Sequence, residues 1–189
     1  FVNAKTLSQS TVITERANTW INLHESLHYM DDSFIWASER DGFQHLYHFD
    51  YSGKLINQLT RGEWIVDKLQ GVNEETGNVY FTGRKDTPTE RHLYKVNLNK
   101  PQHIYRISKR SGFHSITFSK DASVYLDAYS NTAQPTQVSL HNASGQHITW
   151  MEENRVDASH PLHPYLSDWV IPRFGTLKAE DGQTLHYRI

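Results

Sequence analysis

A repeat of 45 residues constrains the fold of this chain more than any single motif. The apolar run at residues 33–37 recurs 45 residues later at 78–82, and again 45 residues later at 123–127. Each run follows a polar turn and precedes a second alternating run, at residues 45–49, 92–96 and 137–141. Repeats of this length, with four short strands in each unit, are typical of β-propeller blades.

The first strand-like run of each unit does not alternate strictly between apolar and polar residues. Phe34-Ile35-Trp36 and Val79-Tyr80-Phe81 are continuous apolar stretches. A strand that is covered on both faces has this pattern, and stacked blades cover the central strands of their neighbours. A plain antiparallel meander would explain the strands but not the two equal intervals.

We therefore predict an all-β fold, namely a partial β-propeller of about three complete four-stranded blades. A fragment of another blade precedes them and a C-terminal linker hairpin follows. The predicted divisions are 1–24 (end of a preceding blade, and a loop), 25–62, 63–108 and 109–153 (blades), and 154–189 (linker and first strands of a further domain). Residues 34–38, 79–83 and 124–128 are predicted to be equivalent strands, and residues 1–2 and 10–14 to be strands joined by a turn at 3–6.

The C-terminal residues depart from the repeat. Residues 155–164 contain two prolines and two histidines and cannot form a regular strand. We expect a strand over 170–171 and 176–179, a hairpin turn at Asp181-Gly182, and a partner strand over 184–189. Because the chain stops inside an apolar run, we expect it to be a segment of a larger protein.

Composition excludes several classes of protein. The chain has no cysteine, which excludes disulfides and thiolate metal sites. Its net charge is −2 with both signs dispersed, so we expect no nucleic-acid or anionic-membrane partner. No stretch approaches the roughly 18 apolar residues of a membrane span.

The sequence contains no Gly-x-Ser-x-Gly elbow and no Gly-x-Gly pair. The letters His-Glu-x-x-His occur at residues 24–28, where we expect a blade strand and not the helix that a zinc site of this kind requires. Of the 12 histidines, His45 and His48 lie in a strand and point to opposite faces, whereas His160 and His163 flank prolines. We interpret them as packed or solvated side chains and predict no metal and no cofactor. The paired carboxylates Glu152-Glu153 could bind an ammonium group, but a solvated blade edge beside Arg155 is the favoured interpretation.

Several stretches together resemble the later propeller blades of the dipeptidyl peptidase IV branch of the prolyl oligopeptidase family, in its bacterial form. The stretches are Ser-Glu-Arg-Asp-Gly-Phe-Gln-His-Leu-Tyr at 38–47, Leu-Thr-Arg-Gly-Glu-Trp-Ile-Val at 59–66, and the runs at 91–96 and 114–121. Residues 174–185 look like the linker hairpin that opens the α/β-hydrolase domain of that family. The resemblance covers essentially all 189 residues.

The resemblance implies a two-domain serine exopeptidase in which a propeller caps a hydrolase domain. Such an enzyme removes N-terminal Xaa-Pro or Xaa-Ala dipeptides by acyl transfer through a Ser-Asp-His triad. No catalytic residue carries over to this chain, and Glu152-Glu153 is not the family's amino-terminus-binding pair. The loop after Trp20 approaches the substrate in some relatives, so His24 and Glu25 are the candidate substrate-pocket residues. The resemblance also favours the periplasm over the cytoplasm.

Three functional hypotheses stay open. The first is a non-catalytic propeller segment that gates a serine dipeptidyl peptidase and supports its hydrolase domain. The second is a free-standing propeller-like interaction module, and the third is the propeller of a related oligopeptidase or acyl-peptide hydrolase. The expected partners are peptide substrates, the missing hydrolase domain, and other copies of the chain. Self-association would use the apolar faces that we expect the first and last sheets to present to water.

Overall fold

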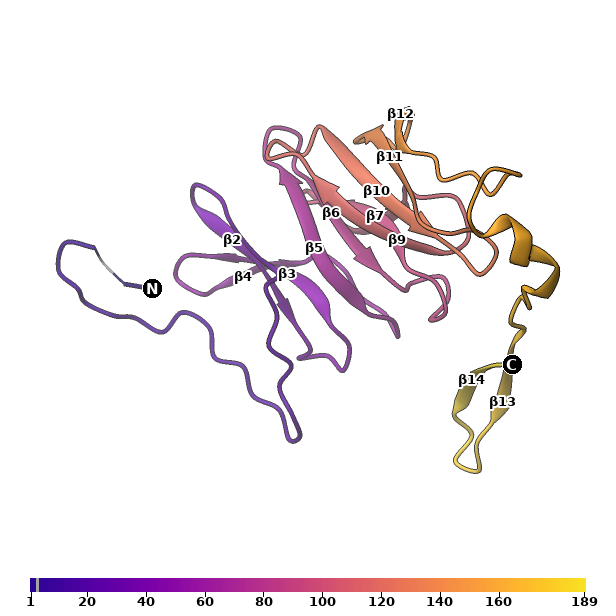
Figure 1. The fold of residues 1–189 in the computed structure, drawn as a ribbon. Coiled ribbons are helices and arrows are strands. Elements are labelled where there is room, and N and C mark those ends of the chain that lie inside the picture. Colours follow the sequence, from indigo (N-terminus) through magenta and orange to yellow (C-terminus); the bar gives the residue numbers. More distant parts are fainter. Residues whose placement is uncertain (3) are drawn as a thin grey trace.

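The computed structural model describes residues 1–2 and 4–189, and in these residues three four-stranded antiparallel sheets follow one another along the chain (Figure 1). The first sheet has the order β1 (Leu27–Tyr29), β2 (Ser33–Ser38), β3 (His45–Asp50) and β4 (Leu55–Gln58). The second consists of β5 (Val66–Asn73), β6 (Asn78–Gly83), β7 (His92–Asn97) and β8 (Lys100–Arg106). The third consists of β9 (Phe113–Phe118), β10 (Val124–Ser130), β11 (Gln137–Asn142) and β12 (His147–Glu152).

The repeat predicted these sheets correctly. β2, β6 and β10 hold the second position in their respective sheets, so the three apolar runs are equivalent strands. Within each sheet every strand pairs with the next strand along the chain. Between sheets, β5 lies against both β1 and β9. Three antiparallel meanders that lie next to one another in this way, with their first strands in contact, are three consecutive blades of a partial propeller.

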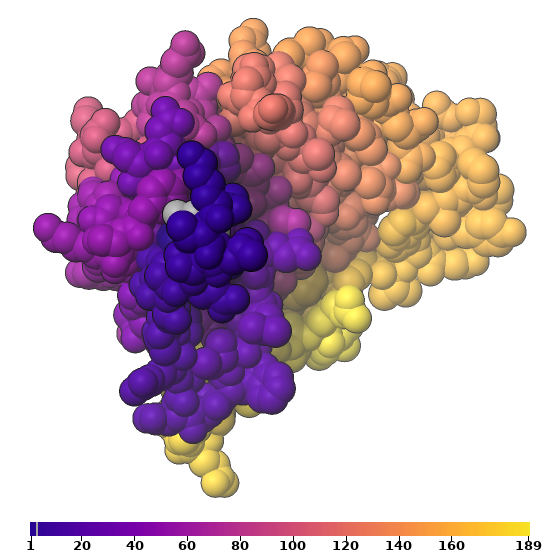
Figure 2. Space-filling view, turned by 90° about the vertical axis from the view of Figure 1, so that its left-hand side faces the viewer, coloured from indigo at the N-terminus to yellow at the C-terminus, as the bar shows by residue number. Residues whose placement is uncertain are grey.

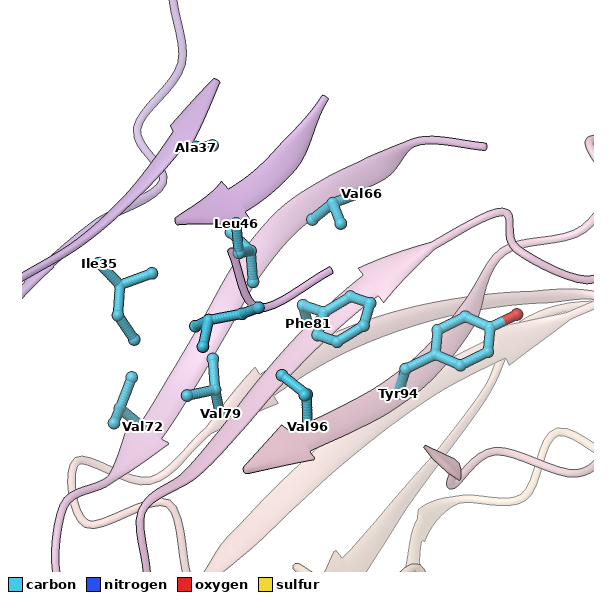
Figure 3. Close-up of a cluster of buried hydrophobic side chains, with 10 residues drawn as sticks. Ile35, Ala37, Leu46, Val66, Val72, Val79, Phe81, Tyr94 and Val96 are labelled. Carbon is cyan, nitrogen blue, oxygen red and sulfur yellow. The ribbon is translucent and has the colours of Figure 1, made fainter. Parts of the chain in front are cut away.

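Two apolar layers hold the blades together. Ile35 and Leu46 of the first sheet pack with Val79 and Phe81 of the second, and all four are completely buried (Figure 3). The neighbouring Tyr80 points the other way, into a second layer with side chains of the third sheet. The second sheet is therefore covered on both faces, which explains the continuous apolar run in β6.

The third sheet is covered on one face only. Tyr125, Asp127 and Tyr129 of β10 are buried, whereas Leu126 between them is 36% exposed. The alternation of buried and exposed residues along β10 thus indicates that one face of the third sheet is uncovered. All six residues of β12 are also exposed. This agrees with the expectation of an uncovered face on the last sheet.

The first sheet differs from that expectation because the N-terminal residues cover it. Val12 and Ile13 pack against Phe34 and Phe49, and the ring of Phe1 lies 5.8 Å from that of Phe34. Figure 2 shows this indigo segment lying in front of the first sheet. Phe1, Val12 and Ile13 thus cover the face of the first sheet that we expected to be exposed to water.

The predicted strands at residues 1–2 and 10–14 are wrong. The structure has an isolated antiparallel bridge between Val2 and Gln9, closed by backbone hydrogen bonds between Phe1 and Ser10. Among the described residues no strand lies beside 10–14 to pair with it, and a lone two-stranded ribbon has little stability in water. Asn3, which we expected to begin the turn, lies outside the described residues.

The C-terminal part contains a short 3-10 helix, η1 (His163–Asp168), and a hairpin of β13 (Phe174–Lys178) and β14 (Thr184–Arg188). The turn at Asp181-Gly182 is as predicted, and Gly182 has the positive φ of 83° that favours glycine. The strand expected at 170–171 is wrong, since these residues lie between η1 and β13 with no pairing partner. The sequence analysis missed η1, although Pro164 occupies its first turn.

Each of the first two blades contains a buried contact between a histidine and a hydroxyl group, which we call the polar joint. It connects the first residue of the third strand to the segment that follows the fourth strand. Nδ1 of His45 lies 3.0 Å from the Thr60 hydroxyl, which also accepts the Leu46 N–H at 3.0 Å. His92 and Ser108 repeat this joint, with the same distance of 3.0 Å from Nδ1 to the hydroxyl. In the third blade, Gln137 takes the histidine position and donates to the Glu153 carbonyl.

We predict that Thr60→Val lowers the free energy of unfolding by about 1–3 kcal/mol, because it leaves a buried imidazole nitrogen and a buried N–H unpaired. Chemical denaturation measures the change. Thr117→Val, at an exposed position of β9, is the matched control and should have little effect. Equal losses in the two variants would contradict a role for the joint.

We also predict that the chain loses stability as the pH falls from about 7 to 5. Burial lowers the pKa of His48, His92 and His141 below the ordinary histidine value. Below pH 6.5 or so the unfolded chain therefore binds more protons than the folded chain, and the free energy of unfolding falls.

His48 offers the test of this pH dependence, because neither of its ring nitrogens has a hydrogen-bond partner within the described residues. His48→Phe should lose less stability between pH 7 and pH 5 than the unmodified chain. Urea denaturation at both pH values measures the difference. An unchanged pH dependence would mean that His48 does not contribute.

Candidate functional site between the N-terminal segment and the first sheet

A cavity of about 710 Å³ lies between residues 10–24 and the first sheet. Its walls are mainly apolar and include Val12, Ile13, Phe34 and Trp36. It exists because the N-terminal segment crosses the sheet face as an extended chain, without pairing to it. A mostly apolar cavity with a few polar groups at one end is the usual form of a ligand site.

The polar end of the cavity is organised around the carboxylate of Glu15. Its Oε1 accepts hydrogen bonds from Trp36 Nε1 at 3.0 Å and from Arg40 Nη2 at 2.6 Å. Its Oε2 accepts the Ser38 hydroxyl at 3.0 Å. Arg40 Nε also donates to the Ser38 hydroxyl at 2.9 Å. A carboxylate with three donors is strongly held in one orientation.

The local backbone places Arg40 for this contact. Ser38 ends β2, and the turn that follows is closed by a hydrogen bond from Gly42 N–H to the Glu39 carbonyl at 2.9 Å. The guanidinium of Arg40 also lies over the Tyr47 ring, 4.9 Å from its centre. Burial, followed by the nearby Asp41 carboxylate, raises the pKa of Tyr47, so this phenol stays neutral beneath the cation.

The two candidate pocket residues lie apart. His24 is half-buried and lines the cavity, with its ring 4.6 Å from the Trp36 ring and its Nδ1 accepting the Ser26 N–H at 3.2 Å. Glu25 is exposed and faces β5, where its carboxylate is 3.8 Å from the Lys68 ammonium. His24 thus belongs to the cavity, and Glu25 belongs to the surface beside it.

The loop that carries these residues exposes large apolar side chains. Trp20 is 79% exposed and Leu23 is 96% exposed. Between them, Asn22 Nδ2 donates to both carboxylate oxygens of Glu39, at 2.9 and 3.1 Å. The loop tip is therefore attached to the turn after β2 while its apolar side chains face outward.

Sequence reasoning missed Glu15, Ser38 and Arg40 as a group. Ser38 and Arg40 entered only as members of the stretch at 38–47 that carries the family resemblance, and Glu15 lies just beyond the strand predicted at 10–14. Their contacts join positions 23 and 25 residues apart. No local spacing signals such a contact, so only the folded chain could reveal it.

A second cavity of about 990 Å³ lies at the ends of the second and third sheets, against the C-terminal hairpin. Arg84, Phe113, Tyr187 and Arg188 are among its lining residues. The Arg84 guanidinium lies 5.6 Å from the centre of the Phe113 ring and is paired with Asp67.

The other polar clusters have ordinary structural partners. Glu153 pairs with Arg155 at 2.7 Å, and His160 Nε2 lies 3.0 Å from Asn154 Oδ1. In residues 1–2 and 4–189, no group of three histidine, aspartate or glutamate side chains could hold a metal ion. Over the same residues, no helix is long and apolar enough to cross a membrane.

Comparison with known proteins gives a consistent result. Residues 1–136 match the family described as the dipeptidyl peptidase IV N-terminal region. Human dipeptidyl peptidase 8 is 31% identical over an alignment of 214 positions, gaps included, which covers 93% of this chain and 23% of that protein. A probable dipeptidyl-aminopeptidase B of Aspergillus oryzae is 30% identical, over 75% of this chain and 16% of the relative.

Among solved structures, dipeptidyl peptidase 4 of Porphyromonas gingivalis superposes with a TM-score of 0.84 at 25% identity. The superposition covers 98% of this chain and 26% of the solved one. The chain thus spans about a quarter or less of the length of the relatives it matches. With three propeller blades in place and a family match over more than half its length, the chain belongs to the dipeptidyl peptidase IV family, to whose N-terminal propeller region it corresponds.

Proposed function

We propose that this chain is the non-catalytic propeller segment of a serine dipeptidyl peptidase, which removes N-terminal Xaa-Pro or Xaa-Ala dipeptides. The observation that carries the proposal is the extent of the match to human dipeptidyl peptidase 8. It spans 93% of this chain, from the blades into the C-terminal residues, at 31% identity. The absence of a Gly-x-Ser-x-Gly elbow from the sequence assigns the chemistry to another part of the parent protein.

In this proposal the propeller segment gates the access of peptides and supports the hydrolase domain. The cavity beside the first sheet supplies the gating surface, since apolar walls with a charged end suit a peptide. His24 lines that cavity and is the stronger of the two candidate substrate contacts. Glu25, beside Lys68, would act only at the rim.

The first test is enzymatic. We predict that the full-length protein hydrolyses Xaa-Pro chromogenic dipeptides and that a serine-directed phosphonate abolishes the activity. The 189-residue chain alone should show no turnover, because it has no nucleophile elbow. Full-length protein that is folded yet inactive on Xaa-Pro and Xaa-Ala substrates would refute the proposed activity.

We propose in addition that the 189-residue chain, when isolated, self-associates through the open face of its third sheet. Leu126 of β10, opposite Leu140 of β11, faces water there, and Met151 of the neighbouring edge strand β12 is 62% exposed. A sheet face of about 300–600 Å² is close to the largest apolar patch that a soluble monomer presents. A second copy would cover the same kind of surface that neighbouring blades cover in this chain.

Light scattering after size exclusion tests this proposal. We expect a species of at least twice the 22.0 kDa of the chain, which Leu126→Glu returns to the monomer. Leu177→Glu, at an exposed position of the C-terminal hairpin, is the matched control and should leave the assembly intact. A monomer at every concentration would contradict self-association.

A further inference from the structure

The walls of the second cavity come from the most cationic part of the chain. Residues 84–91, 106–113 and 184–188 all contribute side chains to these walls. Together the three segments contain seven lysine or arginine residues but only two aspartate or glutamate residues. The whole chain has a net charge of −2, so positive charge is concentrated around this cavity.

Only some of these cations have a carboxylate partner. Arg84, Lys85 and Arg106 each pair with a nearby aspartate. In residues 1–2 and 4–189, no carboxylate lies within ion-pair distance of four others, which are Arg91, Lys109, Arg110 and Arg188. Their charge is therefore available to an anion that the cavity admits.

One carboxylate does line the cavity, but it is already engaged. Glu90 Oε2 lies 2.7 Å from Nε2 of the buried His92 ring. The other nitrogen of that ring lies 3.0 Å from the Ser108 hydroxyl. Glu90 thus belongs to the polar joint of the second blade and does not pair with the arginines.

Two of the unpaired arginines are held in place by uncharged partners. Arg91 Nε donates to the His114 carbonyl at 3.1 Å, and its guanidinium lies 5.7 Å from the centre of the Phe113 ring. The Arg110 guanidinium lies 3.8 Å from the centre of the Tyr129 ring. These contacts leave several of the five N–H donors of each guanidinium unused. An arginine that is already ordered loses little further freedom when it binds an anion.

Aromatic side chains form the rest of the wall. Phe113, Phe174 and Tyr187 line the cavity and are 38%, 52% and 40% exposed. Arg188 lies beside Tyr187 in β14 and also lines it. The volume of about 990 Å³ is at the upper end of the usual range for ligand cavities. The cavity can therefore take a carboxylate and an apolar side chain of the same ligand.

We propose that the second cavity is a binding site for an acidic peptide. Arg188 and Arg91 bind the carboxylate of an aspartate or glutamate, because a guanidinium fits a carboxylate with two parallel hydrogen bonds. Phe113 and Tyr187 contact an apolar side chain next to it in the peptide. Arg110 adds to the attraction at the mouth of the cavity. This inference goes beyond the proposed function and does not depend on hydrolysis.

Isothermal titration calorimetry tests the site with two blocked peptides. The first is acetyl-Ala-Glu-Phe-Ala-amide, and the second is its matched control, acetyl-Ala-Gln-Phe-Ala-amide, which lacks only the charge. The acetyl group prevents removal of an N-terminal dipeptide, so binding is measured without turnover. We expect the glutamate peptide to bind at least about fivefold more tightly, and about 0.5 M NaCl to reduce this preference.

Variants of the arginines locate the site. Arg188→Ala and Arg91→Ala should each weaken binding of the glutamate peptide about three- to tenfold. Arg61→Ala is the matched control, since Arg61 is also exposed but is bonded to Gln58 in the first sheet and does not line the cavity. It should leave the affinity unchanged. Arg188 has no hydrogen bond through its side chain, so its loss should not disturb the fold, and thermal denaturation verifies this for each variant.

The same titration of the full-length protein decides whether the ligand is a separate peptide. Preference for the glutamate peptide in both proteins, reduced in both arginine variants, supports the proposal. Absence of binding, equal binding of the two peptides, or unchanged affinity in the variants overturns it. Binding by the 189-residue chain but not by the full-length protein also overturns it, because an acidic side chain of the parent protein would then fill the cavity. Full-length protein without peptidase activity would refute the proposed function and leave this test unaffected.

Discussion

The face-to-face packing of successive sheets is the constraint on which the rest of this structure depends. Val79 and Phe81 bury one face of β6 against the first sheet, while Tyr80 buries the other face against the third. Most of the fully buried apolar side chains lie in these two layers. Removing the first or the third sheet would expose one face of the second sheet to water. The second sheet could not bury that face by itself, because a single sheet is one layer.

Polar contacts add precision to this packing. The buried joints at His45 and His92 fix the start of the third strand relative to the end of the fourth, and so define each blade outline. The surface contacts of Glu15 and Arg40 do the same for the segment that covers the first sheet. In both cases side-chain hydrogen bonds connect segments that strand pairing does not connect.

The sequence predicts the blades because their signals are local. Three apolar runs at equal spacing, each with a turn before it, determine strands that pair with their nearest neighbours along the chain. The N-terminal segment could not be predicted in this way, since residues such as Val12 have strand-like character but no partner strand. Of the candidate site, the resemblance named only His24 and Glu25 as candidate substrate-pocket residues, and His24 lines the cavity in the structure. Glu15 and Arg40 were not found, because their meeting depends on how an unpaired segment crosses a sheet.

The nearest-neighbour arrangement of the sheets has a consequence for how the chain is made. Each sheet is a meander whose strands adjoin in sequence, so its pairings close after only a few tens of residues. Such short-range contacts form quickly, and each finished sheet offers its face as a template for the next. During synthesis from the N-terminus, the first sheet can form before the third has left the ribosome. The propeller segment can therefore fold in the direction of translation, and the outer face of each completed sheet stays exposed until the next sheet forms.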